Sequence, residues 1–237
     1  MRNYRSSEFN QNEIFSSISQ EVSSNKVLRN TYFLLTISLI PSIFGTLFGL
    51  SSSINKLMLL NPGITTILFI FGSFALMFAI EKNKTNSLGI IFLLCFTFFM
   101  GIMLSRLIGI VLGMNNGQQL IFIAFSGTAA IFSIMATLSS IIKKDLSNFQ
   151  KWLSIGLVAI LIVALANIFM KINALVLTIS VISMSIFSAF ILVDLQRIIK
   201  GGETNYISAT LAIYLNIYNV FSNLLIILAS LFGTNRD

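Results

Sequence analysis

The sequence predicts an all-α fold: a polytopic membrane protein whose seven transmembrane helices form a bundle. Of its 237 residues, 56% are hydrophobic and only 10% are charged, whereas about a quarter of the residues in a soluble domain are charged. The apolar residues stand in long runs, and a helix needs about 20 such residues to cross a bilayer. The runs do not alternate in short segments of about ten residues, so they favour helices over a transmembrane barrel.

The chain begins with a polar segment. Residues 1–25 are rich in Ser, Asn, Gln and Glu and lack the apolar core of a cleavable signal peptide. A segment of this composition cannot pack a core of its own. We therefore expect residues 1–25 to be a disordered cytosolic tail, followed by one membrane domain over residues 26–237.

The first three helices are delimited by charge and by turn residues. Residues 30–55 carry no charge, and the first helix fits within residues 31–50. The tripeptide Asn61-Pro62-Gly63 predicts a turn and a helix start, followed by a second helix over residues 64–80. The third helix, over residues 87–113, is interrupted only by Arg106.

The remaining helices are separated by polar segments. A tight turn over residues 114–119 leads into a fourth helix over residues 119–141. The fifth and sixth helices, residues 152–170 and 173–198, are separated only by the short connection at Lys171. A polar loop over residues 200–205 then precedes the seventh helix, over residues 206–232.

Basic residues predict the orientation, because they concentrate in cytosolic loops. If the N-terminus is cytosolic, nine basic residues lie inside: Lys26, Arg29, Lys82, Lys84, Lys143, Lys144, Lys151, Arg197 and Lys200. Three then lie outside: Lys56, Lys171 and Arg236. The distribution therefore predicts a cytosolic N-terminus and an external C-terminus.

The composition excludes several function classes. The net charge of +7 comes from dispersed residues that form no nucleic-acid-binding motif. The chain has no His and a single Cys, which removes His-based zinc and haem sites and Ser-His or Cys-His nucleophile pairs. We therefore expect no enzyme activity, no metal and no cofactor. Cys95 lies in an apolar run and is expected to be a small core residue.

Two ionisable residues within the helices are candidates for function, because such groups are costly in a bilayer. Arg106 lies roughly 27 Å along the third helix, which places it near the outer face, where its side chain can reach the headgroups. Asp194 lies about 31 Å along the sixth helix, near the inner face. A pair between Asp194 and Arg197 on the same helix is the ordinary structural explanation for Asp194.

The seventh helix carries a stripe of amides. Asn216, Asn219 and Asn223 are spaced at i, i+3 and i+7, which is one helical face. This face should point into the bundle. It either joins helices by hydrogen bonds or lines a polar, proton-sensing cavity with Asp194. Gly45 and Gly49 form a G-x-x-x-G motif that predicts close helix packing, as do Gly109 and Gly113.

Three segments resemble the Bax inhibitor family of seven-helix membrane proteins, also called the TMBIM family, and more closely its bacterial YccA branch. They are residues 26–32 (KVLRNTY), 124–132 (AFSGTAAIF) and 201–207 (GGETNYI). The resemblance extends from about residue 25 to the C-terminus. It singles out the loop that contains Gly201, Gly202, Glu203, Asn205 and Tyr206 as a candidate interaction surface.

The branch resemblance implies an inner-membrane protein that interacts with a membrane-anchored AAA protease of the FtsH type and modulates it. Some family members instead carry two facing aspartates that are associated with a pH-sensitive calcium leak. Asp194 matches the first aspartate, but the second position is Asn216, so that pair is incomplete. The chain also has Ser105-Arg106 where the family usually has Gly-Pro. The resemblance therefore implies a protease modulator, with a calcium or ion leak as the alternative.

Overall fold

The computed structural model describes the backbone of residues 2–51, 60 and 62–234, and the side chains of residues 22–51, 60 and 63–234. Over these residues the fold is all-α, as predicted. Seven of its helices are long and apolar enough to cross a membrane. Lys56 and Arg236, two of the three basic residues assigned to the outer side, lie outside the described residues.

The helix bounds agree closely with those predicted from hydropathy. The helices are α1 (Arg2–Leu50), α3 (Pro62–Lys82), α4 (Ser87–Leu112), α5 (Gly117–Ile141), α6 (Ser147–Met170), α7 (Asn173–Ile199) and α8 (Tyr206–Phe232). Pro62 begins α3, a position at which proline's missing N–H costs nothing. The largest difference among the later helices is α6, which begins five residues before the predicted residue 152.

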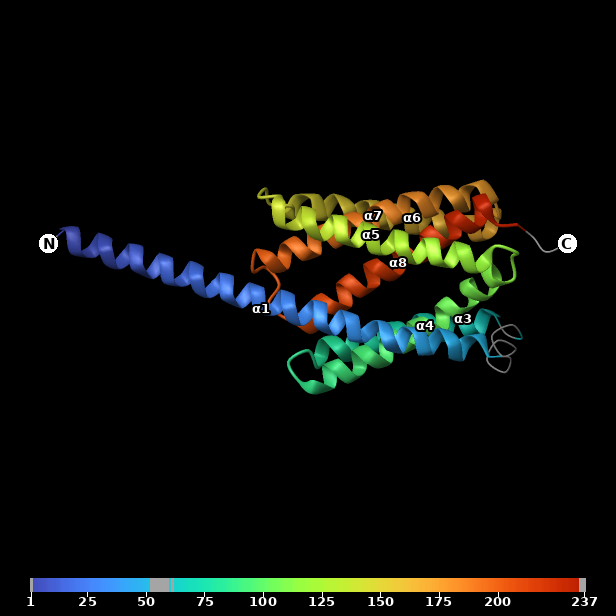
Figure 1. Ribbon diagram of the computed structural model, residues 1–237, viewed down its shortest axis with the longest axis horizontal. Coiled ribbons are helices and arrows are strands. Elements are labelled where there is room, and N and C mark those ends of the chain that lie inside the picture. The colour runs from blue at the N-terminus through green and yellow to red at the C-terminus, as the bar shows by residue number, and fades with distance from the viewer. Residues whose placement is uncertain (1, 52–59, 61, 235–237) are drawn as a thin grey trace.

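The first helix is much longer than predicted. It begins at Arg2, so residues 2–25 are helical in the structure, whereas the sequence predicted a disordered tail. Residues 2–40 contain neither Gly nor Pro, so no residue in this segment interrupts a helix that continues outward from the bundle. Figure 1 shows this N-terminal half of α1 projecting beyond the other helices.

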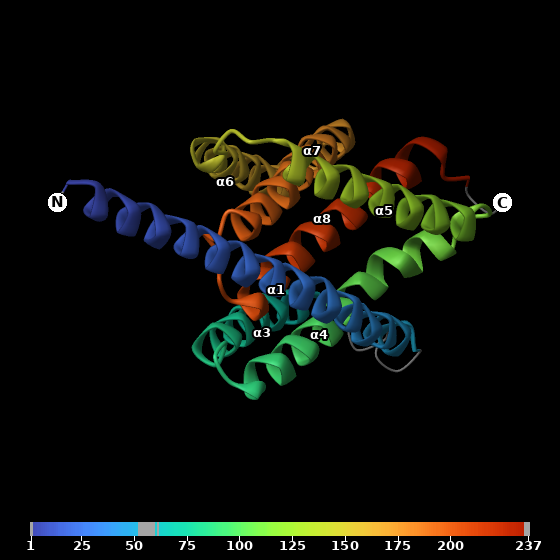
Figure 2. The same ribbon diagram turned by 60° about the vertical axis from the view of Figure 1, so that its left-hand side comes forward.

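The last helix is the centre of the bundle. Figures 1 and 2 show α8 passing between a group formed by α1, α3 and α4 and a group formed by α5, α6 and α7. It packs against α7, α5, α1 and α4. The main core joins fully buried side chains of four helices, including Ile80, Phe96, Leu195 and Ile213. The position of α8 explains why its polar residues meet partners from several helices.

The short connection between α6 and α7 has a clear cause. The connection between α6 and α7 is confirmed at Lys171, which adopts a left-handed conformation with φ 53°. The buried side chain of Asn167 holds this turn by accepting from Ile172 N (3.0 Å) and donating to Ile172 O (3.3 Å). These bonds offset the cost of a left-handed residue that is not glycine.

The packing of α1 on α4 depends on small residues. A Cβ atom at Gly45 would lie 2.0 Å from the Phe98 carbonyl oxygen, and one at Gly101 would lie 2.1 Å from the Ser42 carbonyl oxygen. A Cβ at Gly49 would lie 2.3 Å from the side-chain hydroxyl oxygen of Ser105. The first G-x-x-x-G motif therefore forms a close helix contact, as predicted. The second does not, because a Cβ at Gly109 meets only the tip of Leu50, at 3.3 Å.

Three connections lie at one end of the bundle, which we call the basic end: loop 83–86, loop 142–146 and loop 200–205. Lys84, Lys143, Lys144 and Lys200 all belong to these loops. Figure 1 shows that the N-terminal half of α1 projects from the same end, whereas the C-terminus lies at the opposite end. Most of the basic residues from which the orientation was predicted therefore lie at the basic end.

Candidate functional site

The structure brings Asp194 and Asn216 together across the contact between α7 and α8. The Asn216 amide donates a hydrogen bond of 2.7 Å to the Asp194 carboxylate. Asn216 is buried, and Asp194 is half-buried. Arg197, the expected helical partner of Asp194, instead forms an ion pair with Glu203 at 3.5 Å. The described hydrogen-bond partner of Asp194 therefore lies on the neighbouring helix and not on its own.

The other two members of the amide stripe act within their own helix. Asn219 donates to the Leu215 carbonyl, and Asn223 donates to the Asn219 carbonyl, each at 2.8 Å. Both side chains are half-buried. Within the part of the chain that the structure describes, Asn216 is the one of the three with a hydrogen bond to a second helix. The stripe therefore divides into one interhelical contact and two intrahelical ones.

Loop 200–205 is ordered by its own polar residues. Gly201 has φ 73°, a left-handed conformation that glycine adopts without strain. Asn205 accepts from the backbone N–H groups of Ile207 and Ser208 and so caps α8, which begins at Tyr206. The Glu203 carboxylate accepts from Asn205 N at 2.9 Å. The predicted interaction loop is therefore a fixed turn.

This loop also holds the connection between α3 and α4. The Asn205 side chain donates to the Lys84 carbonyl at 2.9 Å, and Ser208 donates to the Glu81 carboxylate at 2.9 Å. Glu81 also pairs with Lys84. This partner raises the pKa of the Lys84 ammonium, because the negative charge favours its protonated form.

A residue that the sequence analysis did not select, Gln196, holds the third loop. Its amide donates to the carbonyls of Ile142 (2.8 Å) and Lys144 (3.0 Å) and accepts from Leu146 N at 3.2 Å. Gln196 is 2% exposed. The signal was present in the sequence, since a polar amide within an apolar run is the same kind of evidence that identified Asn216.

A second missed cluster lies deeper in the bundle. The hydroxyls of Ser42 on α1 and Tyr214 on α8 are 2.7 Å apart, and Ser42 also donates to the Thr97 carbonyl on α4 at 3.1 Å. Hydroxyl residues are frequent in apolar helices and often bond to their own backbone. For that reason their positions in the sequence did not indicate a contact among three helices.

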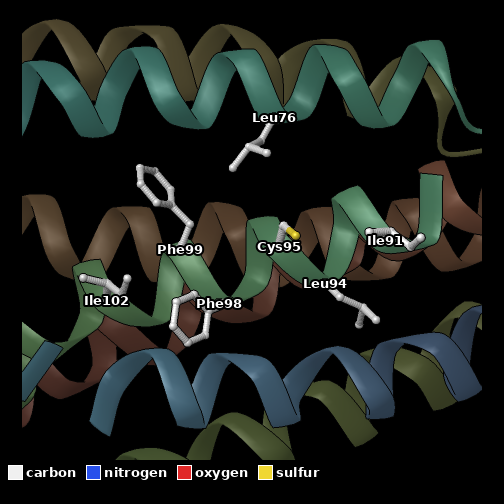
Figure 3. Close-up of a pocket in the computed structure, with 7 residues that line it drawn as sticks. All are labelled: Leu76, Ile91, Leu94, Cys95, Phe98, Phe99 and Ile102. Carbon is white, nitrogen blue, oxygen red and sulfur yellow. The ribbon is translucent and has the colours of Figure 1, made fainter. Parts of the chain in front are cut away.

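The positions of Arg106 and Cys95 were also predicted from the sequence. Arg106 is exposed near the end of α4 that lies away from the basic end, far from Asp194, as expected. Cys95 was expected in the core, but it is exposed. It borders an apolar hollow of about 430 Å³ between α3 and α4, lined by Leu76, Ile91, Leu94, Cys95, Phe98, Phe99 and Ile102 (Figure 3). In a membrane an exposed apolar residue faces hydrocarbon, so hydropathy alone does not distinguish the two positions.

The chemistry of these contacts is that of binding and positioning. A carboxylate, amides and hydroxyls can exchange hydrogen bonds and protons, but they form no activated nucleophile. Among the described residues, no three His, Cys, Asp or Glu side chains come together as a metal site would require.

Comparison with known proteins gives the family. Residues 24–233 match the family described as "Inhibitor of apoptosis-promoting Bax1". A protein of Escherichia coli strain K12 named "Modulator of FtsH protease YccA" is 40% identical over 207 residues, which cover 87% of this chain and 91% of that protein. An uncharacterised membrane protein of Vibrio cholerae is 36% identical over 213 residues, or 90% of this chain and 93% of that protein. A protein of a second Escherichia coli strain with the same 40% identity is named "Inner membrane protein YccA". The chain is therefore a multi-pass membrane protein that belongs to the Bax inhibitor (TMBIM) family and is similar to its YccA members.

Proposed function

We propose that this protein is an inner-membrane modulator that inhibits a membrane-anchored AAA protease of the FtsH type by direct interaction. The observation that carries the proposal is the 40% identity, over nearly the whole of both chains, to the Escherichia coli protein named as a modulator of FtsH protease. The role is one of binding, which agrees with a site built from hydrogen-bonding groups. No chemical step by this chain is required.

The proposed contact surface is the basic end. We place this end, with the N-terminus, in the cytosol, because it holds most of the basic residues. Loop 200–205 is its centre, since Asn205 binds the backbone of Lys84 and Lys200 binds the backbone of Lys143 in loop 142–146. A partner that approaches from the cytosol would meet three loops held as one rigid surface, which lowers the entropy cost of binding.

The N-terminal half of α1 supplies a second element of the proposal. It projects from the basic end (Figure 1), and a helix without tertiary packing is marginal in water. We propose that residues 2–22 unfold readily and serve as the handle that an ATP-driven protease grips. The bundle then resists extraction and occupies the enzyme.

The interaction can be tested by purification from native membranes with an affinity tag on the chain. We expect the AAA protease to co-purify with the full chain and with a variant that carries Arg106→Gln at the far end. Replacing Glu203 and Tyr206 by Ala should reduce the recovered protease several-fold. Recovery of no protease with the full chain would contradict the proposal.

The handle is tested separately by deleting residues 2–22, which keeps Lys26 and Arg29 for insertion. The truncated chain should have a longer half-life than the full chain in membranes with active protease, and the same half-life without it. Equal half-lives in the presence of protease would show that the tail is not the handle.

A second candidate function is an ion leak, and the observation that favours it is the contact of Asp194 with Asn216. These residues match the positions of the two facing aspartates of some relatives. Calcium flux into liposomes that contain the purified protein tests this alternative. A flux that disappears on Asp194→Asn would favour it over the protease modulator.

A further inference from the structure

Four lysines gather at one corner of the basic end. Lys200 at the end of α7 donates to the Lys143 carbonyl at 3.0 Å, so these two residues lie side by side. Lys144 follows in the chain, and its carbonyl accepts from Gln196. Lys151 lies in the second turn of α6, which starts directly after this loop. We call Lys143, Lys144, Lys151 and Lys200 the lysine corner.

The backbone of this corner is fixed, although its side chains are exposed. The buried Gln196 makes three hydrogen bonds to residues 142, 144 and 146. Lys143, Lys144 and Lys151 are all exposed. A fixed backbone with mobile ammonium groups can hold an anion at a defined place on the protein surface, because only the side chains must be ordered on binding.

Ion pairs among the described residues differ between this corner and the rest of the basic end. Within the side chains that the structure describes, ion pairs join Lys84 to Glu81 and Arg197 to Glu203, whereas Lys143, Lys144 and Lys151 form none. The nearby acid, Asp145, accepts from the hydroxyl (2.7 Å) and the backbone N–H (3.0 Å) of Ser147. These bonds, together with the nearby charge of Lys200, lower the pKa of the Asp145 carboxyl. Asp145 therefore stays charged and offsets part of the positive charge at Lys200, so the site depends mainly on Lys143, Lys144 and Lys151.

The depth of the corner is indicated by an aromatic residue. Trp152 is the single tryptophan of the chain, and its side chain is 72% exposed. It lies directly after Lys151, about 8 Å along α6 from Ser147. Tryptophan is enriched where the hydrocarbon core meets the headgroups. From this preference we expect the lysine ammonium groups to lie near the level of the lipid phosphates.

We propose that the lysine corner is a binding site for the headgroup of an anionic phospholipid, with Trp152 packed against the upper part of its acyl chains. The phosphate accepts from the lysine ammonium groups, and Trp152 contacts the hydrocarbon beside them. The opposite corner, at loop 83–86, differs because Lys84 is paired with Glu81. A headgroup there would have to displace a carboxylate in direct contact with the ammonium group, whereas Asp145 at the lysine corner is bonded to Ser147. The proposal is independent of the protease partner.

Trp152 makes the test possible without a label, since its emission comes from this site alone. The full chain is reconstituted in zwitterionic bilayers with a small fraction of either anionic or zwitterionic lipid that is brominated near the headgroup. Bromine quenches tryptophan at short range. We expect stronger quenching by the anionic lipid at equal mole fraction, and we expect this preference to fall as salt is added.

The variant is the triple change Lys143→Gln, Lys144→Gln and Lys151→Gln. A lysine near an anionic surface contributes about a five-fold preference, so the selectivity should fall by at least that factor. The matched control is Lys26→Gln, Lys82→Gln and Lys84→Gln, which removes the same charge from the same end and should keep the selectivity. Circular dichroism verifies that both variants remain helical.

Two results would overturn the proposal. Equal quenching of the unaltered chain by the two brominated lipids would show that no anionic lipid is selected at Trp152. An equal loss of selectivity in both triple variants would show that the general positive charge of the basic end, and not the lysine corner, attracts the lipid.

Discussion

The side-chain amide of Asn216 on α8 donates a 2.7 Å hydrogen bond to the carboxylate of Asp194 on α7. The two residues are separated by 22 positions and by a complete loop. Their contact joins the central helix to its neighbour close to the basic end. Because of this contact, the single substitution Asn216→Asp would place two carboxyl groups face to face.

Changing Asn216 to Asp should make the contact of α7 with α8 depend on pH. At low pH the two carboxyl groups share a proton, and an O–H···O bond replaces the amide bond. At high pH both are charged and repel each other. The thermal unfolding midpoint of the variant, relative to that of the unaltered chain, should therefore fall between pH 6 and pH 8, by the equivalent of about 1–3 kcal/mol.

Asn219→Asp is the control for this prediction. Asn219 bonds to the Leu215 carbonyl of its own helix, so a carboxyl group there does not replace a donor to Asp194. The change in its unfolding midpoint between pH 6 and pH 8 should be clearly smaller. Identical pH profiles for the two variants would contradict the contact.

Gln196 holds the backbone of loop 142–146, so its replacement should loosen this loop. Replacing Gln196 by Leu removes three hydrogen bonds and leaves backbone groups of the loop without a protein partner. We expect a loss of about 1–3 kcal/mol in unfolding free energy. Trypsin should also cleave faster after Lys143 and Lys144. Gln119→Leu, at an exposed position on α5, serves as the control and should leave the rate of cleavage unchanged.

The contact of α1 with α4 leaves no room for a methyl group at Gly45. Gly45→Ala places a Cβ 2.0 Å from a backbone oxygen of α4, so the helices must separate, at a cost of about 1–3 kcal/mol. Gly63→Ala is the matched control, because a Cβ there has nothing within 4 Å. Thermal unfolding in detergent compares the two, and equal midpoints would show that α1 and α4 do not pack this closely.

The orientation predicts the side on which each terminus lies. With seven spans and the basic end in the cytosol, a reporter fused after residue 237 should be active on the external side of the membrane. A reporter fused within loop 142–146 should be active in the cytosol. A cytosolic signal from the fusion at residue 237 would mean that the N-terminus is external or that one helix does not cross.

The sequence alone determined the seven membrane-length helices among the described residues and nearly all of their bounds. Hydrophobic length is a local property, and the bilayer sets the number of residues that a span requires. The short connection at Lys171 was found this way, and so was the close packing implied by Gly45 and Gly49. The extent of α1 toward Arg2 was not, because a polar composition argues against a packed core but does not interrupt a helix.

Only the tertiary structure decided which polar residues meet. Periodicity places Asn216, Asn219 and Asn223 on one helical face, yet only Asn216 bonds to α7, since the crossing and register of two helices decide which member of a face finds a partner. The same reason explains why Gln196 binds loop 142–146. Likewise, Arg197 pairs with Glu203, because loop 200–205 folds back over the end of α7 and brings that carboxylate within reach.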